Sequence, residues 1–246
     1  MNIVDFNPLS LIDFPGRLST VVFTKGCNLR CRFCHNPELV LNRARLGIED
    51  EFFEYIEKNN IKSIVITGGE PLMDSALSDI LAKLKDLGAS VKLDTNGSFP
   101  NMLYAYLQRN FVDFVSLDLK GLNTEDIQYI TRVESFTLSK FLYTLSIIKA
   151  YKNKVANEPI NFNFEIRLTL WKPYEVNDYL MFLEELDKKG MLLDEDEYII
   201  IQRLNLNDKL LDKTFRNNKL ANIASSDHYI EKLNKDLVYV KNIKIR

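Results

Sequence analysis

The sequence predicts an α/β fold in which six strands alternate with helices along the chain. Short segments rich in β-branched residues recur between longer segments with helical periodicity. The apolar runs Ile64–Ile66 and Tyr198–Ile201 are typical of strands that are buried on both faces. Such alternation favours a parallel sheet. Because six units are too few for a closed eight-stranded barrel, we expect an open partial (β/α)6 barrel with a short C-terminal extension.

The expected elements follow from apolar patterns and from end signals. Asp74 is expected as a helix N-cap, Pro100 as a first-turn proline, and Gly88 as the residue that follows a helix. The strands are expected at Ser19–Thr24, Ser63–Thr67, Ala89–Asp94, Phe111–Leu117, Asn161–Leu170 and Glu197–Gln202. The helices are expected at Ile48–Asn59, Asp74–Leu87, Pro100–Arg109, Phe136–Asn153 and Tyr174–Lys189.

The length of 246 residues suits one core domain, which we place at 1–203, and an extension at 204–246. The extension shows a helical stretch followed by a strand-like segment, Leu237–Ile245. No apolar run approaches the ~18 residues of a membrane span, and the N-terminus does not resemble a signal peptide. The net charge of −2 gives no field that attracts nucleic acid. We therefore expect a cytoplasmic protein with no nucleic-acid or membrane partner.

Charge is distributed unevenly in the last third of the chain. Residues 175–197 carry nine acidic residues and two lysines, whereas residues 204–246 carry nine Lys or Arg and five Asp or Glu. These stretches are either solvated faces or a docking surface for a partner protein.

Three cysteines, Cys27, Cys31 and Cys34, lie within eight residues, and the sequence has no others. Thiolates hold the irons of iron–sulfur clusters, and three of them leave one iron of a [4Fe–4S] cluster without a protein sulfur. An open coordination position is typical of a catalytic metal site. A zinc site would require a fourth ligand, and a disulfide framework would require an even number of cysteines. We therefore favour a cluster over these alternatives and over three buried thiols.

Polar residues follow several of the expected strands, at the edge where parallel α/β barrels place their reactive groups. The glycines of one such segment allow close backbone approach to a ligand, and alternation puts Asp118 and Lys120 on one face. Each of these residues also has an explanation that involves no ligand. Gly68–Pro71 and Asn96 would form ordinary turns, Asp118 and Lys120 would form an ion pair, and Arg167 would pair with Asp94 or Asp118. The residues are Gly68, Gly69, Glu70, Asp94, Asn96, Asp118, Lys120 and Arg167.

The Cys-x3-Cys-x2-Cys spacing, with Phe33 before the last cysteine, closely resembles that of radical S-adenosylmethionine (SAM) enzymes. The resemblance implies one [4Fe–4S] cluster whose open iron is chelated by SAM. One electron then cleaves SAM to methionine and a 5′-deoxyadenosyl radical. It also implies that the Gly68-Gly69-Glu70 loop binds the amino group of SAM.

Within that superfamily, the chain resembles the glycyl-radical-enzyme activating enzymes from about Leu9 to Arg203. It looks most similar to activators of anaerobic ribonucleoside-triphosphate reductase. The motifs are Ser10–Gly16, Cys34–Glu38, Asp94–Gly97 and Asp118–Lys120.

This second resemblance implies further roles. Lys120 would bind the methionine carboxylate, and Asp94 and Asp118 would help to hold a monovalent cation. Phe33 and His35 would border the adenine, Asn96 would lie among the cofactor-binding residues, and Arg167 would hold the ribose or the substrate.

The expected reaction is hydrogen abstraction from a glycine of a partner enzyme. The resemblance implies a low-potential electron donor such as flavodoxin or ferredoxin. Two alternatives remain: radical chemistry on a small molecule, as in 7-carboxy-7-deazaguanine synthase, and a non-catalytic iron–sulfur electron carrier. The joint presence of Gly68–Pro71, Asp118 and Lys120 counts against the carrier.

Overall fold

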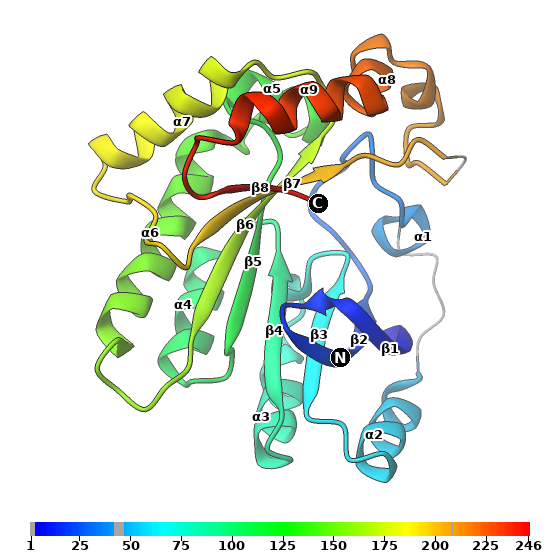
Figure 1. Cartoon of the computed structure of the whole chain (residues 1–246). Helices are drawn as coiled ribbons and strands as arrows, with labels where there is room; N and C mark the ends of the chain where they lie inside the picture. The colour runs from blue at the N-terminus through cyan, green and yellow to red at the C-terminus, as the bar shows by residue number, and fades with distance from the viewer. Residues whose placement is uncertain (1–2, 42–46, 208) are drawn as a thin grey trace. The chain divides into compact units, whose positions relative to one another are not determined.

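The computed structural model describes residues 3–41, 47–207 and 209–246 (Figure 1). Within these residues the strands occur in the sheet in chain order, from β1 to β8. The β1–β2 pair is antiparallel, whereas β2–β3, β3–β4, β6–β7 and β7–β8 are parallel. The strands are β1 (Ile3–Phe14), β2 (Arg17–Thr24), β3 (Ser63–Gly68), β4 (Ser90–Thr95), β5 (Phe114–Leu119), β6 (Asn163–Leu170), β7 (Tyr198–Arg203) and β8 (Ile243–Ile245).

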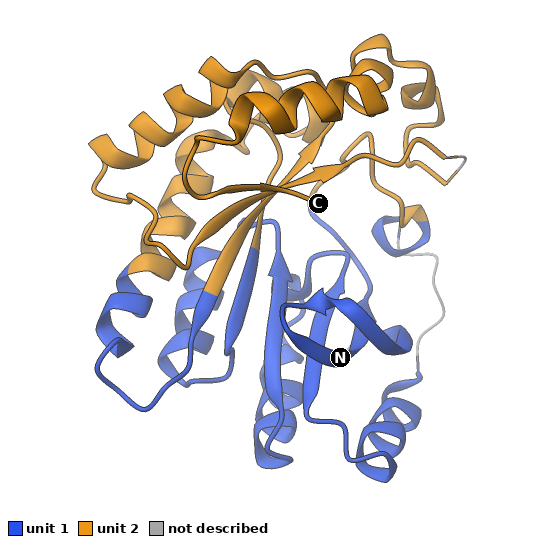
Figure 2. Cartoon of the chain, viewed as in Figure 1, with its two compact units in different colours: residues 1–28, 38–116, 150–163 blue, residues 29–37, 117–149, 164–246 orange. Residues whose placement is uncertain are grey.

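The chain divides into two compact units, which Figure 2 shows in different colours. Unit 1 comprises residues 1–28, 38–116 and 150–163, and unit 2 comprises residues 29–37, 117–149 and 164–246. Each unit is built from several separate segments of the chain, and the division falls within the cysteine segment, after Asn28.

Unit 1 holds β1 to β4 and the helices that connect them. In β3 the residues Ile64, Val65 and Ile66 have no exposed surface, because neighbouring elements cover both faces of the strand. Helix α2 packs against β1, and α3 packs against β4. The helices of this unit are α1 (Pro37–Val40, of which Pro37 belongs to unit 2), α2 (Glu49–Lys58), the 3-10 helix η1 (Pro71–Met73), α3 (Leu77–Asp86) and α4 (Pro100–Gln108).

Unit 2 holds β6, apart from its first residue, together with β7 and β8 and the helices of the C-terminal half. Helix α9 packs against both α7 and α8. The central residues of β7, Ile199 to Ile201, are buried, as expected from the apolar run. The helices are α5 (Thr124–Thr131), α6 (Leu138–Val155, which ends in unit 1), α7 (Val176–Lys188), the 3-10 helix η2 (Lys213–Asn217), α8 (Lys219–Ala224) and α9 (Asp227–Leu237).

All six expected strands and all five expected helices are present, with ends shifted by up to three residues. Pro100 is the first residue of α4, as predicted. Gly88 follows α3 with a left-handed backbone (φ +70°). Asp74 does not cap α3, because that helix begins later, after Ala76. Its side chain instead accepts a hydrogen bond from the Ala76 N–H (2.9 Å) within the preceding turn.

The sequence did not predict β1, α5 or the short helices α1, η1 and η2, and its prediction of a C-terminal strand was largely wrong. Strand β1 contains Pro8 and pairs with β2 through several register shifts, so it lacks the regular alternation of a strand. Helix α5 is only eight residues long, although Asn123 caps it as a sequence reading could have proposed. The predicted strand Leu237–Ile245 is wrong over most of its length, because α9 continues to Leu237 and only Ile243–Ile245 pairs in the sheet. In the part of the chain that the structure describes, no helix combines the length and apolar character needed to cross a membrane.

Candidate functional site

The predicted site residues divide between the two units. Cys27 and the residues at the ends of β3 and β4 and just after them belong to unit 1. Unit 2 holds Cys31, Phe33, Cys34 and His35, together with Asp118 near the end of β5, Lys120 just after it, and Arg167 in β6.

In unit 1 the two glycines after β3 lie against the backbone that leads to Cys27. A Cβ on Gly68 would lie 2.4 Å from the Thr24 nitrogen, and a Cβ on Gly69 would lie 1.8 Å from the Gly26 oxygen. The Gly69 N–H donates to the Thr24 carbonyl (2.9 Å), and the Glu70 N–H donates to the Gly26 carbonyl (2.7 Å). These glycines are therefore required by close backbone packing in this structure, whatever ligand the loop also binds.

The Glu70 carboxylate joins the loop after β3 to the loop after β4. The side chain has no exposed surface. One oxygen accepts hydrogen bonds from the Leu72 N–H (3.2 Å) and the Thr95 hydroxyl (2.8 Å), and the other accepts from the Asn96 N–H (2.7 Å). Burial of a carboxylate is tolerated when several donors satisfy it, so Glu70 is suited to fixing both loops.

Asn96 extends from this linked pair of loops to the first cysteine. Its Nδ2 donates to the Asn28 Oδ1 (3.0 Å) and lies 3.9 Å from the Cys27 Sγ. An amide donor at this position can stabilise an anionic sulfur. The tertiary structure therefore gives Asn96 a contact with a cysteine that its turn position in the sequence did not indicate.

Asp94, at the end of β4, pairs with a lysine that the sequence analysis did not single out. Lys92, two residues earlier on the same strand, is completely buried, and its Nζ donates to the Asp94 Oδ1. A charged residue in an otherwise apolar strand, two positions from a carboxylate, was the available signal.

In unit 2, Asp118 lies between two cations. Its Oδ2 accepts from the Lys120 Nζ (2.9 Å), and its Oδ1 accepts from Arg167 Nε (2.9 Å) and Nη2 (2.8 Å). Burial alone would raise the pKa of Asp118, but Arg167 and Lys120 outweigh it and lower the pKa to about 2. The ion pair between Asp118 and Lys120 and the pair of Arg167 with Asp118, both open alternatives in the sequence, are present.

Lys120 connects this ion-pair group to the cysteines. Burial lowers its pKa, yet the charges of Asp118 and Cys31 raise the pKa above its ordinary value, so the ammonium stays charged. Its Nζ lies 5.8 Å from the centre of the Phe33 ring, and its carbonyl accepts a hydrogen bond from Trp171 Nε1 (2.9 Å).

Cys31 and Cys34 lie in a tight turn, which we call the cysteine turn (residues 31–34). The Cys34 N–H donates to the Cys31 carbonyl (3.0 Å). Burial raises the pKa of Cys34, while a backbone hydrogen bond at Asn36 and the charge of Lys120 lower it. His35, which follows the turn, donates from Nε2 to the Asn205 carbonyl (2.5 Å).

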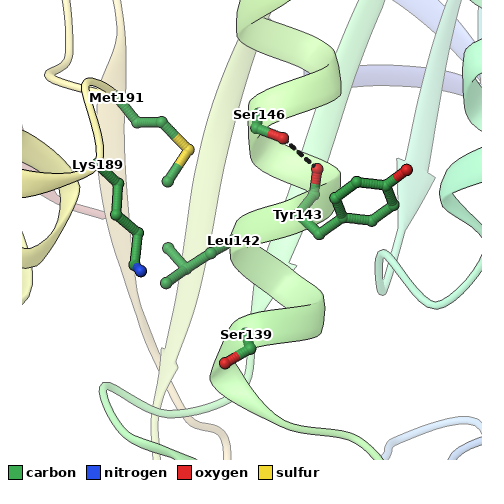
Figure 3. Close-up of a pocket in the computed structure, with 6 residues that line it drawn as sticks. All are labelled: Ser139, Leu142, Tyr143, Ser146, Lys189 and Met191. Carbon is green, nitrogen blue, oxygen red and sulfur yellow. Dashed lines mark hydrogen bonds between the residues drawn. The ribbon is translucent and has the colours of Figure 1, made fainter.

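Two of the surface pockets in the described part of the chain are lined by residues of unit 2. One, of about 500 Å³, begins at the end of β7 next to the partner of His35. It is lined by Arg203, Leu204, Asn205, Leu206 and Ser225. The other, of about 270 Å³, lies beside α6 and contains none of the predicted site residues (Figure 3). It is lined by Ser139, Leu142, Tyr143, Ser146, Lys189 and Met191.

The acidic stretch 175–197 is not a purely external face. Lys149 of α6 donates to Asp194 (3.0 Å) and to the fully buried Glu197 (2.8 Å). Two of the nine acidic residues therefore neutralise an internal lysine, which weakens the view of this stretch as a docking surface.

The donor set fits thiolate ligation of a cluster. None of the three cysteines forms a disulfide. Cys27 has an amide donor near its sulfur, and Lys120 places positive charge near Cys31 and Cys34. At Cys34 burial outweighs this charge, so the pKa of its thiol is raised. Among the described residues, no three Cys, His, Asp or Glu side chains form a group that could hold a single metal ion. The ligands of a [4Fe–4S] cluster need not converge on a single metal ion, because each thiolate binds a separate iron.

Comparison with known proteins identifies the family of this chain. The profile of the radical SAM superfamily matches residues 21–165, more than half of the chain. The chain therefore belongs to the radical SAM superfamily, a class of enzymes, as its cysteine spacing predicted.

More particular relatives agree with the predicted branch. The chain is 38% identical over 113 residues to a candidate glycyl-radical enzyme activating enzyme of Methanocaldococcus jannaschii, covering 46% of this chain and 47% of that protein. It is 30% identical over 157 residues to the pyruvate formate-lyase-activating enzyme of Staphylococcus aureus, covering 57% of this chain and 61% of that protein. These matches span about half to three fifths of the relatives' lengths.

A solved structure supports the fold alone. The crystal structure of Streptococcus suis SuiB bound to precursor peptide SuiA has a TM-score of 0.62 at 13% identity, covering 92% of this chain and 48% of that chain. Together with the strand order and the family match, this likeness confirms the predicted open α/β barrel of the radical SAM type.

Proposed function

We propose that this chain cleaves SAM at one [4Fe–4S] cluster and installs a glycyl radical on a partner enzyme, anaerobic ribonucleotide reductase. The observation that carries the proposal is the Cys27, Cys31 and Cys34 set, within the matched family region and without any fourth cysteine. Three thiolates leave one iron open for SAM. When bound and reduced, the cluster and SAM supply the 5′-deoxyadenosyl radical.

The chain's own residues bind and orient SAM. Lys120 is partly exposed and charged, so its ammonium suits the methionine carboxylate as a partner. The oxygens of Glu70 already accept three hydrogen bonds. We therefore assign Glu70 to fixing the loop, and we assign backbone carbonyls of the Gly68–Glu70 loop to binding the amino group.

The adenosine end is assigned to unit 2. Phe33 and His35 flank Cys34, and the carbonyl that accepts from His35 belongs to Asn205, which lines the pocket at the end of β7. The location of this pocket supports binding of the adenine of SAM beside residues 33–35. Arg167 is assigned to holding Asp118, and through it Lys120, because its guanidinium binds that carboxylate through two nitrogens.

A monovalent cation beside the SAM carboxylate is left out of the proposal. Asp94 and Asp118, the expected ligands, each accept from a protein cation, Lys92 in the first case and Lys120 with Arg167 in the second. A carboxylate that is paired in this way has less need of an added ion.

A protein substrate is favoured over a small metabolite because both relatives described above are named as activating enzymes. The electron donor would be a low-potential protein such as flavodoxin or ferredoxin. A reducing compartment, the cytoplasm, suits a chain whose three cysteines form no disulfide. We place the core at residues 1–203 and the extension at 204–246.

The decisive experiment mixes the reconstituted chain anaerobically with the reductase of its host, SAM and a reductant. A glycyl radical doublet in electron paramagnetic resonance is expected, with deoxyadenosine formed in proportion. The Cys31→Ala variant is the control and should give neither signal. Deoxyadenosine without a protein radical on any glycyl radical enzyme of the host would contradict the activase assignment and favour a small-molecule substrate.

A further inference from the structure

The extension, for which the sequence suggested no role in the site, reaches the cysteine turn within unit 2. The Leu211 N–H donates to the Cys34 carbonyl (2.8 Å), and the Asp212 N–H donates to the Arg32 carbonyl (3.1 Å). Two carbonyls of the turn are therefore bound by consecutive residues of the extension.

The opposite side of the same backbone is bound by the end of α5. The Arg30 N–H donates to the Thr131 carbonyl (3.0 Å), and the Arg32 N–H donates to the Ile130 carbonyl (2.9 Å). Arg32 is thus held through both its N–H and its C=O. Since Arg32 lies between Cys31 and Cys34, this bracket defines where those two sulfur-bearing residues lie.

The Asp212 side chain completes the bracket through charge. It is only 8% exposed, and its Oδ2 accepts from Arg32 Nη1 (2.8 Å) and from Arg132 Nη2. Its Oδ1 accepts from the N–H (3.1 Å) and the hydroxyl (2.6 Å) of Thr214. Burial alone would raise the pKa of Asp212, but these hydrogen bonds and both arginines lower it to about 2.

Two further features indicate that this arrangement is specified in detail. Arg132 follows α5 with a left-handed backbone (φ +58°), a conformation that is uncommon for residues other than glycine, and its guanidinium pairs with Asp212. The Arg32 guanidinium lies 4.7 Å from the centre of the Tyr129 ring, and its Nε donates to the Tyr129 carbonyl (3.1 Å). The position of Arg32 is therefore determined from α5 and from the extension together.

We propose that Leu211 to Thr214 brace the cysteine turn, with Asp212 as a positioning residue for the cluster ligands Cys31 and Cys34. This inference rests on the proposed function, because it requires a cluster at those cysteines. Partners behind the ligands of a metal site orient the ligands and tune the metal's redox properties. Asp212 also supplies the negative charge that balances two guanidinium groups beside the turn.

The first test measures iron release from the anaerobically reconstituted full chain to a ferrous chelator. Asp212→Asn is expected to release iron roughly tenfold faster than the unaltered chain, since one charge-assisted contact contributes a factor of about that size. Asp227→Asn is the matched control, because Asp227 also lies in the extension and pairs with an arginine, Arg203, at an exposed position. It should release iron at the unaltered rate.

The second test uses the reduction potential of the cluster, which separates positioning by charge from a general loosening of the fold. Asp212→Asn leaves two guanidinium charges uncompensated and should shift the potential in the positive direction. Arg32→Met removes one of those charges and should shift it in the negative direction. The double variant should have a reduction potential close to that of the unaltered chain. Should either single variant fail to fold, the other still reports a signed shift.

Three outcomes would overturn the brace. One is an iron-release rate for Asp212→Asn equal to that of Asp227→Asn. The second is an unchanged potential, and the third is a shift of the same sign in both single variants. In each of these cases the unaltered chain would still carry a cluster and cleave SAM, so the proposed function would stand. If the unaltered chain takes up no cluster, the proposed function and the brace both fail.

Discussion

The site residues around Cys27 in unit 1 are held by close backbone packing, whereas those around the cysteine turn in unit 2 are held by ion pairs. Around Cys27, two glycines pack against the backbone of residues 24–26, and one fully buried carboxylate, Glu70, satisfies donors from two loops. Around the cysteine turn, Asp118 and Asp212 each pair with two cations. Unit 1 should therefore respond mainly to changes of volume, and unit 2 to changes of charge and pH.

The largest effect is expected for Gly69→Ala. Its new Cβ would lie 1.8 Å from a backbone oxygen, which cannot rotate away, so we expect a loss of about 3 kcal/mol or more in the free energy of unfolding. Gly16→Ala is the control, since Gly16 has a positive φ but no atom within 4 Å of the added Cβ. A cost of about 1 kcal/mol, from the backbone conformation alone, is expected there. Denaturant unfolding compares them, and equal losses would refute the packing argument.

Lys120→Ala tests the role of charge in unit 2. It should change the binding of SAM and leave the iron content intact. The lost contact is charge-assisted, so SAM affinity should fall roughly ten- to a hundredfold, while Asp118 keeps Arg167 as its partner. Equilibrium binding of SAM to the reconstituted chain measures the change. Lys140→Ala, on an exposed part of α6, is the control. Unchanged affinity would mean that Lys120 serves only its ion pair.

Acid should act on unit 2 through Asp118. The pKa of Asp118 is about 2 in the folded chain against an ordinary value of 3.8. Its contribution to the free energy of unfolding is therefore present above pH 4 and is lost as the pH falls towards 2. The difference amounts to about 2 kcal/mol. Asp118→Asn should lower stability at neutral pH and flatten this part of the pH profile. Denaturant unfolding from pH 5 to pH 2.5 tests it, and identical profiles would contradict the assignment.

The smallest effect is expected from monovalent cations. Because Lys92 already pairs with Asp94, replacing K⁺ by a bulky organic cation should leave the rate of SAM cleavage unchanged. Lys92→Met removes that ammonium and should make cleavage respond to K⁺. A dependence on K⁺ in the unaltered chain would restore the cation that we left out of the proposal.

Much of the fold could be predicted because its signals are local. The runs at Ile64–Ile66 and Ile199–Ile201 are apolar over consecutive residues, and they are buried as expected. Strand β1 escaped detection because Pro8 and several register shifts interrupt its alternation. Ion pairs between residues close in the sequence, such as Asp118 with Lys120, could be proposed as alternatives to a role in ligand binding.

The amino-acid sequence by itself determined the family, the three candidate cluster ligands and the order of strands and helices, since these depend on spacing and periodicity along a short stretch of chain. Only the tertiary structure decided which charged partners meet. Arg32 and Asp212, for example, are 180 residues apart in the sequence and in contact in the structure. The reason is physical: an ion pair depends on the distance between side chains after folding, and no local pattern encodes that distance.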